Sequence, residues 1–137
     1  SSSFYEFAGI VLRWEEDAII IEAKNRLEAG DVFEFLSPNS DKIILRRLYE
    51  FEVIHANGKD FGKSRLDKVI HAGQKPQIRI PLSSFHLENK SELKRILPEL
   101  TLIRKERSLE EFEKNRINLH DQSLKKEEGE KNDNKYI

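Results

Sequence analysis

The histidines are the side chains most able to bind a metal or move a proton. Metal sites built on histidine usually hold two of them close in sequence, for example four residues apart on one helix face. The four histidines of this chain lie 16, 15 and 34 residues apart, so their spacing predicts no metal site. They are His55, His71, His86 and His120.

Acidic and hydroxyl side chains show no catalytic pattern either. Glu15-Glu16-Asp17 is typical of a solvated turn, because a general acid needs an apolar pocket to raise its pKa. Ser83-Ser84 and Ser91 lack the Gly-x-Ser-x-Gly context of an activated serine, and the six glycines form no phosphate loop. We therefore expect no catalytic residue, no metal and no cofactor.

Basic side chains give one candidate contact surface. Residues 1–58 hold six Lys and Arg against eleven Asp and Glu, whereas residues 59–82 hold six against two. Such a strip can bind phosphates or an acidic partner, but it can also keep loops soluble, and the single interleaved aromatic, Phe61, favours the second interpretation. The candidate strip contains Arg46, Arg47, Lys59, Lys63, Arg65, Lys68, Lys75 and Arg79.

The composition limits the class of protein. A chain of 137 residues suits one domain with an appendage. The net charge of -1 gives no global sign of a nucleic-acid or membrane partner, and no apolar run approaches the roughly 18 residues of a spanning helix. The absence of cysteine excludes disulfides and thiolate metal sites and fits a cytoplasmic location.

Short apolar runs separated by turns dominate residues 4–82. Ile19, Ile20 and Ile21 suit a strand that is covered on both faces, and Asn57-Gly58 is a strong hairpin signal. The pattern predicts a mainly β fold, a small closed or nearly closed β-barrel over residues 4–82. We expect its core to include Phe7, Ile10, Leu12, Ile20, Val32, Phe35, Ile44, Leu48, Phe51, Val53, Ile78 and Ile80.

The polar segment that begins with Asn25-Arg26 and ends with Gly30-Asp31 predicts a structural turn. Gly30 is expected to supply a positive φ, and Asp31 is expected to cap the turn through its carboxylate. Arg26 is expected to pair with Glu28 or Glu34. These roles favour a structural interpretation of the segment over a binding one.

Residues 83–120 change to a helical pattern. Leu93, Ile96, Leu97 and Leu100 form an apolar stripe, and a capping box at residues 108–111 predicts a second helix to about residue 119. Residues 83–120 are therefore expected to be a helical appendage. Residues 121–137 are almost wholly polar and are expected to be a disordered tail.

These motifs resemble the C-terminal domain of the collagenase-like peptidase family U32. The resemblance covers about residues 5–82 and rests on the run Tyr5 to Val11, on Asn25-Arg26 with Gly30-Asp31 and Glu34, on Pro38 and on Gly58. It departs from the family pattern at Leu27, where a Phe is usual, and at Phe33, where a Leu is common. No catalytic motif of the family lies in this chain.

The resemblance implies a fold similar to domain two of elongation factor Tu and a position after a catalytic domain of the same polypeptide. Family members are described as peptidases, some as collagenases, while relatives take part in RNA hydroxylation. The first hypothesis is a non-catalytic accessory domain that helps a collagenase-like enzyme bind a protein substrate. The alternative is a module that contacts structured RNA through the basic strip; an autonomous hydrolase comes last, and no membrane partner is expected.

Overall fold

A computed structural model describes residues 3–56, 58–85 and 89–108. Residues 5–105 form one compact unit, to which all contacts discussed below belong. Its elements, with the strand ends that extend to residues 3 and 108, are β1 (Ser3–Trp14), β2 (Ala18–Ala23), β3 (Leu27–Glu28), β4 (Val32–Leu36), β5 (Ile43–Arg47), β6 (Phe51–Ile54), η1 (Gly58–Asp60), β7 (Ser64–Asp67), β8 (Val69–Ile70), η2 (Ala72–Gln74), β9 (Gln77–Pro81), η3 (Leu82–Ser84), α1 (Lys90–Ile96) and β10 (Leu102–Ser108).

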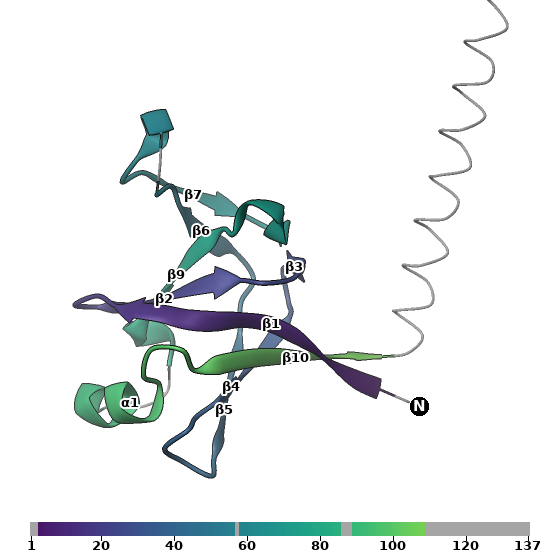
Figure 1. The fold of residues 1–137 in the computed structure, drawn as a ribbon, viewed down its shortest axis with the longest axis vertical. Helices are drawn as coiled ribbons and strands as arrows, with labels where there is room; N and C mark the ends of the chain where they lie inside the picture. Colours follow the sequence, from purple (N-terminus) through teal and green to yellow (C-terminus); the bar gives the residue numbers. More distant parts are fainter. Residues whose placement is uncertain (1–2, 57, 86–88, 109–137) are drawn as a thin grey trace, which may run out of the picture. The chain divides into compact units, whose positions relative to one another are not determined.

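Eight of these strands form one strongly curled sheet (Figure 1). Its order is β5-β4-β10-β1-β2-β9-β6-β7, and β3 and β8 form a separate two-stranded sheet. In the described part of the chain, β5 and β7 remain at opposite edges, so strand pairing produces a half-barrel rather than a closed barrel. The prediction of a mainly β, nearly closed barrel is confirmed in this form.

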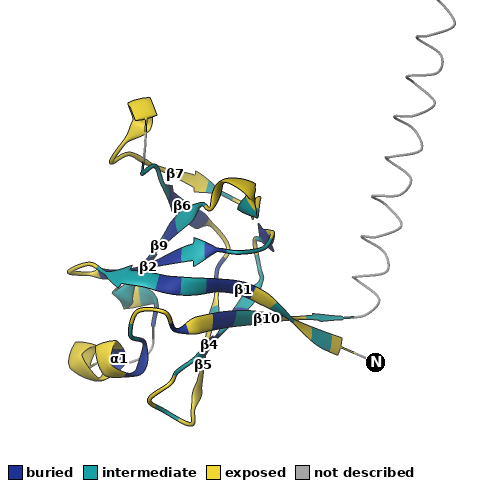
Figure 2. Ribbon diagram, in the orientation of Figure 1, coloured by how far each residue is buried: buried dark blue, intermediate teal, exposed yellow. Residues whose placement is uncertain are grey.

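Buried residues occur along the strands of the curled sheet (Figure 2), and most of them form one hydrophobic core. In β2 every residue except Glu22 is buried, as the three isoleucines predict. Ile19 and Ile21 face the core, while Ile20 lies on the opposite face and is also fully buried. Phe33 stacks against Phe51 in this core, with ring centroids 6.2 Å apart.

Most of the predicted core is confirmed, but four predicted members, three in β1 and one in β4, are not buried. Phe7 is 44% exposed, and Ile10, Leu12 and Val32 are only half-buried. The residues buried in their place are Ala8 and Val11 in β1 and Phe33 in β4. Ile44 is half-buried and packs against the core, and the remaining predicted members are buried: Ile20, Phe35, Leu48, Phe51, Val53, Ile78 and Ile80.

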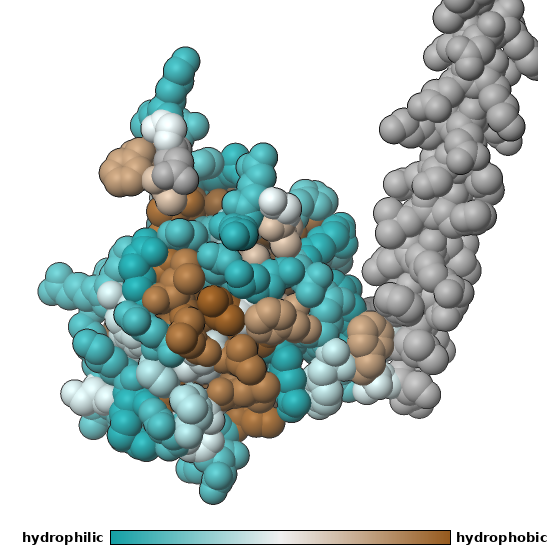
Figure 3. Space-filling view, in the orientation of Figure 1, coloured by the Kyte–Doolittle hydropathy of each residue, from teal (hydrophilic) through white to brown (hydrophobic). Residues whose placement is uncertain are grey.

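The error has a physical cause. Side chains alternate between the two faces of a strand, so Val32 and Phe35 cannot share a face, whereas Phe33 and Phe35 do. In β1 both faces carry apolar residues, and hydrophobicity alone does not choose between them. The result is an outward apolar surface, and Figure 3 shows apolar side chains gathered over β1, β2 and β10.

Within residues 83–120, the described part can be compared with the helical prediction at α1 and at β10. Helix α1 begins after Asn89, whose side chain accepts a hydrogen bond from the Glu92 amide at 3.1 Å, and it buries Leu93 and Ile96. Residues 102–108, however, form β10, so this part of the predicted appendage is wrong. Residues 104–107 are four consecutive charged residues, so the sequence shows no apolar alternation that would predict this strand.

The placement of β10 joins the later part of the chain to the sheet. It lies between β4 and β1, with Ile103 opposite Phe35 in the core. The predicted second helix and the predicted tail lie outside the described residues. Among the residues that are described, no helix combines the length and the apolar character needed to cross a membrane.

Candidate functional site

The turn between β3 and β4 joins the two edges of the half-barrel. The Gly30 amide donates to the carbonyl of Leu48, just after β5, at 2.7 Å. The Ala29 amide donates to the carbonyl of Lys68, just after β7, also at 2.7 Å. The chain before the turn adds to the same junction, because β3 pairs with β8. We call this junction, made by residues 25–31, the seam.

Local interactions shape the seam as the sequence predicts. Gly30 has a φ of +92°, a conformation in which an L side chain is strained. The Asp31 carboxylate accepts a hydrogen bond from the Glu28 amide at 2.8 Å, and Arg26 pairs with Glu28. Asn25 donates from Nδ2 to the carbonyl of Phe7 at 2.7 Å, which ties the seam to β1.

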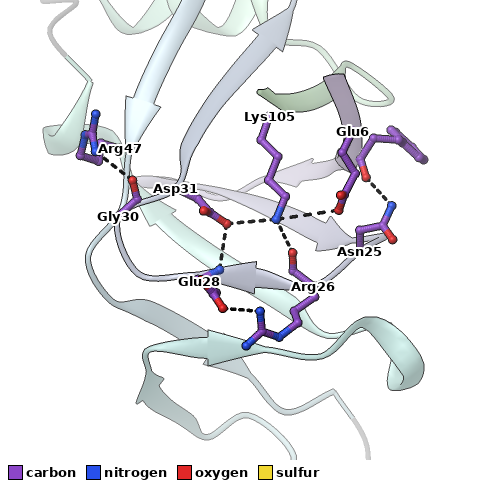
Figure 4. Close-up of polar contacts among 9 residues, drawn as sticks. Glu6, Asn25, Arg26, Glu28, Gly30, Asp31, Arg47 and Lys105 are labelled. Carbon is purple, nitrogen blue, oxygen red and sulfur yellow. Dashed lines mark hydrogen bonds and ion pairs between the residues drawn. The ribbon is translucent and has the colours of Figure 1, made fainter. Parts of the chain in front are cut away.

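A lysine from β10 holds the seam from inside the barrel (Figure 4). The Lys105 side chain is only 2% exposed. Its Nζ lies 3.0 Å from Oδ2 of Asp31 and 3.9 Å from Oε1 of Glu6, and it donates to the carbonyl of Arg26. An ammonium group has three donors, and three acceptors face this one. We call Glu6, Arg26, Glu28, Asp31 and Lys105 the seam cluster.

The seam cluster is best explained as a structural feature of the fold and not as a catalytic site. Its amine is enclosed and engaged, so it presents no free nucleophile or base to a substrate. Sequence reasoning missed Lys105, because a lysine among other charged residues normally indicates a solvated surface. The one available signal is its period-two spacing from Ile103, which places both side chains on the inner face of β10.

A groove of about 400 Å³ on the outside of the sheet is the better candidate for binding. The strands β1, β6 and β9 supply its floor, and the loop between β6 and β7 supplies one wall. That wall carries Phe61, which is 74% exposed, next to Lys63. His55 and Ile54 line the same groove.

Arg79 fixes the floor of the groove. Its Nη2 lies 2.6 Å from Asp17 Oδ1, its Nη1 3.3 Å from Glu52 Oε2 and its Nε 3.8 Å from Glu15 Oε2. The hydrogen bond to Asp17 raises the pKa of Arg79 most, desolvation opposes that rise, and Glu52 adds to it. Arg79 is thus a cation whose charge three carboxylates already compensate. We call these four residues the groove cluster.

The other predicted basic residues divide among several places. Lys63 lines the groove, 3.8 Å from Asp60, and Lys59 is exposed in the same loop. Arg65 and Lys75 line a second groove of about 450 Å³, where Arg65 donates to Asp67 at 2.8 Å.

The remaining three basic residues lie near the seam. Lys68 is exposed beside it, and Arg47 donates to the Gly30 carbonyl at 3.0 Å. Arg46 is next to Arg47 in β5, so the two side chains leave opposite faces of the sheet. The eight residues therefore do not form one basic face, and their binding role stays a prediction.

The histidines remain apart where the structure describes them. His55 is half-buried in the groove and His71 is exposed. Among the described residues, no group of three His, Asp or Glu side chains is arranged to hold a metal ion. His86 and His120 lie outside the described residues.

Comparison with known protein families identifies a family for this chain. The model of the peptidase family U32 C-terminal domain matches residues 4–91. This range includes the seam turn and the whole lining of the groove, and it ends before β10 and Lys105. No curated protein and no solved structure matches the chain.

Proposed function

The chain belongs to the family of peptidase family U32 C-terminal domains, and from this premise we propose that it is a non-catalytic accessory domain of a collagenase-like peptidase. Its role is to bind a protein substrate and position it for the catalytic domain of the same polypeptide. The observation that carries the proposal is the groove, in which one exposed aromatic ring lies beside a fixed set of charges of both signs.

Such a groove suits an extended polypeptide. Phe61 and Ile54 offer apolar contact, and an exposed aromatic ring often anchors a binding partner. Glu52 and Lys63 offer an acceptor and a donor to a peptide backbone or to charged side chains. Because the groove cluster already pairs Arg79, ion pairs define the geometry of the floor before any ligand arrives, which lowers the entropic cost of binding.

Binding to denatured collagen tests the proposal. Gelatin titrated onto the chain should bind, and Phe61→Ser should weaken the affinity by about tenfold, the loss expected for one aromatic anchor. Tyr49→Ser is the matched control, because Tyr49 is also an exposed aromatic, at 68%, but does not line the groove. Equal loss in both variants, or no binding by the parent chain, would contradict the groove as the substrate site.

Kinetics of the parent enzyme separate positioning from catalysis. In a peptidase that carries this domain, Phe61→Ser should raise KM for gelatin and leave kcat for a short peptide unchanged, because a short peptide does not reach the groove. The isolated chain should hydrolyse neither substrate. Hydrolysis by the purified chain that is lost on changing one residue within it would overturn the accessory role.

One observation favours the alternative function, an RNA-contacting module of an RNA-hydroxylating relative. Lys59, Phe61 and Lys63 lie on one exposed loop, where an aromatic ring can stack on a base while the lysines contact phosphates. RNA affinity should then fall with salt, with a log–log slope of about 0.7–0.9 for each phosphate engaged. Lys63→Glu should flatten that slope, and salt-independent gelatin binding without RNA binding would reject the alternative.

A further inference from the structure

A row of apolar side chains crosses three strands on the outer face of the sheet. Leu102 of β10 lies opposite Leu36 of β4, which in turn lies opposite Ile43 of β5. Leu102 is 51% exposed and Ile43 is 45% exposed. Figure 3 shows apolar surface over β10, where this row begins.

The next row continues the surface. Leu45, which is 59% exposed, lies opposite Glu34, whose carboxylate is 3.2 Å from Nε of Arg104. The Arg104 guanidinium also lies 3.8 Å from the ring centroid of Tyr5. The polar groups on this face pair with one another. The remaining side chains, Leu36, Ile43, Leu45 and Leu102, form its apolar part. We call these four residues the apolar row.

The apolar row ends at a free strand edge. Throughout the part of the chain that the structure describes, β5 pairs with β4 on one side and with no strand on the other. The backbone N–H and C=O groups on that free side form a template to which another strand can add. Exposed apolar side chains on an edge strand are unusual in a protein that works alone, because they invite such pairing.

The charges of β5 indicate what kind of strand fits. Residues 42–47 carry Lys42, Arg46 and Arg47 and no acidic residue. Two copies of residues 42–47 paired edge to edge would bring six cations into one small region, which disfavours a second copy of this chain. Charge complementarity instead calls for carboxylates on the added strand.

We propose that β5 and the apolar row form a docking surface for an extended acidic segment of a partner protein. The segment adds to the sheet as a ninth strand, with apolar side chains opposite Ile43 and Leu45 and carboxylates opposite Arg46 and Arg47. The surface is distinct from the groove, which is lined from β1, β6, β9 and the β6–β7 loop. The proposal therefore goes beyond the proposed function and does not depend on it.

A designed peptide tests the docking surface. The probe is a fluorescein-labelled peptide with the central sequence Glu-Asp-Val-Thr-Val, written to run antiparallel to β5. It should bind the 137-residue chain with a Kd below about 1 mM, and a Lys-Lys-Val-Thr-Val peptide should bind about tenfold more weakly. Hydrogen exchange should slow at the amides of β5 on the complex and leave those of β7 unchanged.

Two leucines provide a matched pair of variants. Leu45→Ser removes an apolar contact on the β5 edge and should weaken peptide binding by about tenfold. Leu66→Ser changes a leucine of similar exposure, 65%, on the opposite edge strand and should bind the peptide as the parent does. Both residues are surface residues, so both variants should fold.

Three results would overturn the proposal. The first is the absence of peptide binding up to about 1 mM, and the second is equal binding by the two leucine variants. The third is self-association in sedimentation that Leu45→Ser abolishes, which would identify a second copy of this chain as the occupant. None of these results bears on gelatin binding by the groove, so the two proposals fail separately.

Discussion

The seam cluster and the groove cluster are both ion-pair clusters, but one lies in the interior of the fold and the other at its surface. Each sets one long cation against carboxylates that are far from it in the sequence. The Lys105 side chain is 2% exposed and its main partner Asp31 is 21% exposed, whereas Arg79 is 22% exposed and its main partner Asp17 is 76% exposed. From this comparison we expect burial, rather than the number of partners, to separate an ion cluster that stabilises a fold from one that shapes a surface.

The strongest test of this contrast is Lys105→Met. The change should lower the free energy of unfolding by about 3 kcal/mol, because it leaves the Arg26 carbonyl without this donor and the Asp31 carboxylate with the Glu28 amide but no cation, in a largely buried site. Urea denaturation measures the effect. The added change Asp31→Asn should recover part of the loss, because it removes the unpaired charge.

Arg104→Met is the control for this experiment. Arg104 is the neighbouring residue on β10, but its ion pair with Glu34 lies on the outer face. Its replacement should cost no more than about 1 kcal/mol. If Lys105→Met lowers the free energy of unfolding no more than this control does, the seam cluster does not stabilise the fold. The proposed difference between the seam cluster and the groove cluster would then be wrong.

An intermediate effect is expected from Gly30→Ala. An added Cβ at Gly30 meets no atom within 4 Å, so the whole cost comes from the φ of +92° and should be about 1 kcal/mol. Gly73→Ala is the matched control, since it is equally open and has no such φ. Equal denaturation midpoints for the two variants would show that the seam turn tolerates a side chain.

The smallest effect is expected from Arg79→Met. Water reaches the groove cluster and screens the carboxylates that lose their partner, so the stability loss should stay below about 1 kcal/mol. The same variant should weaken gelatin binding, because the floor of the groove loses its fixed cation. A stability loss as large as that of Lys105→Met would mean that the two clusters play the same role.

What the sequence predicts well is local. The positive φ of Gly30, the cap by Asp31 and the Arg26–Glu28 pair all involve residues within a few positions, and turn chemistry alone indicates them. Both faces of β2 are also predicted correctly, because three consecutive isoleucines leave no polar face. The family resemblance follows from the same local pattern.

What the sequence does not predict depends on distant pairing. Lys105 contacts Asp31 across 74 positions, and nothing in either neighbourhood indicates the other. The outward side chains of β1 are misassigned because Phe7 is more apolar than the buried Ala8, and only the paired strands decide which face is covered. The groove combines β1, β6 and β9, so no single segment of the sequence contains it.

The position of β10 has a consequence for the timing of folding. The last strand that the structure describes, β10, lies in the middle of the sheet between β4 and β1, and the ribosome delivers it after both of these neighbours. Before β10 is synthesised, the edges of β4 and β1 that it covers in the folded protein are exposed. The Asp31 carboxylate also lacks its ion pair with Lys105 at that stage. A fragment that stops at residue 91, where the family model ends, would stay in that open state. Because β10 makes its contacts over long sequence distances, we expect folding to be slow and the nascent chain to be exposed to aggregation.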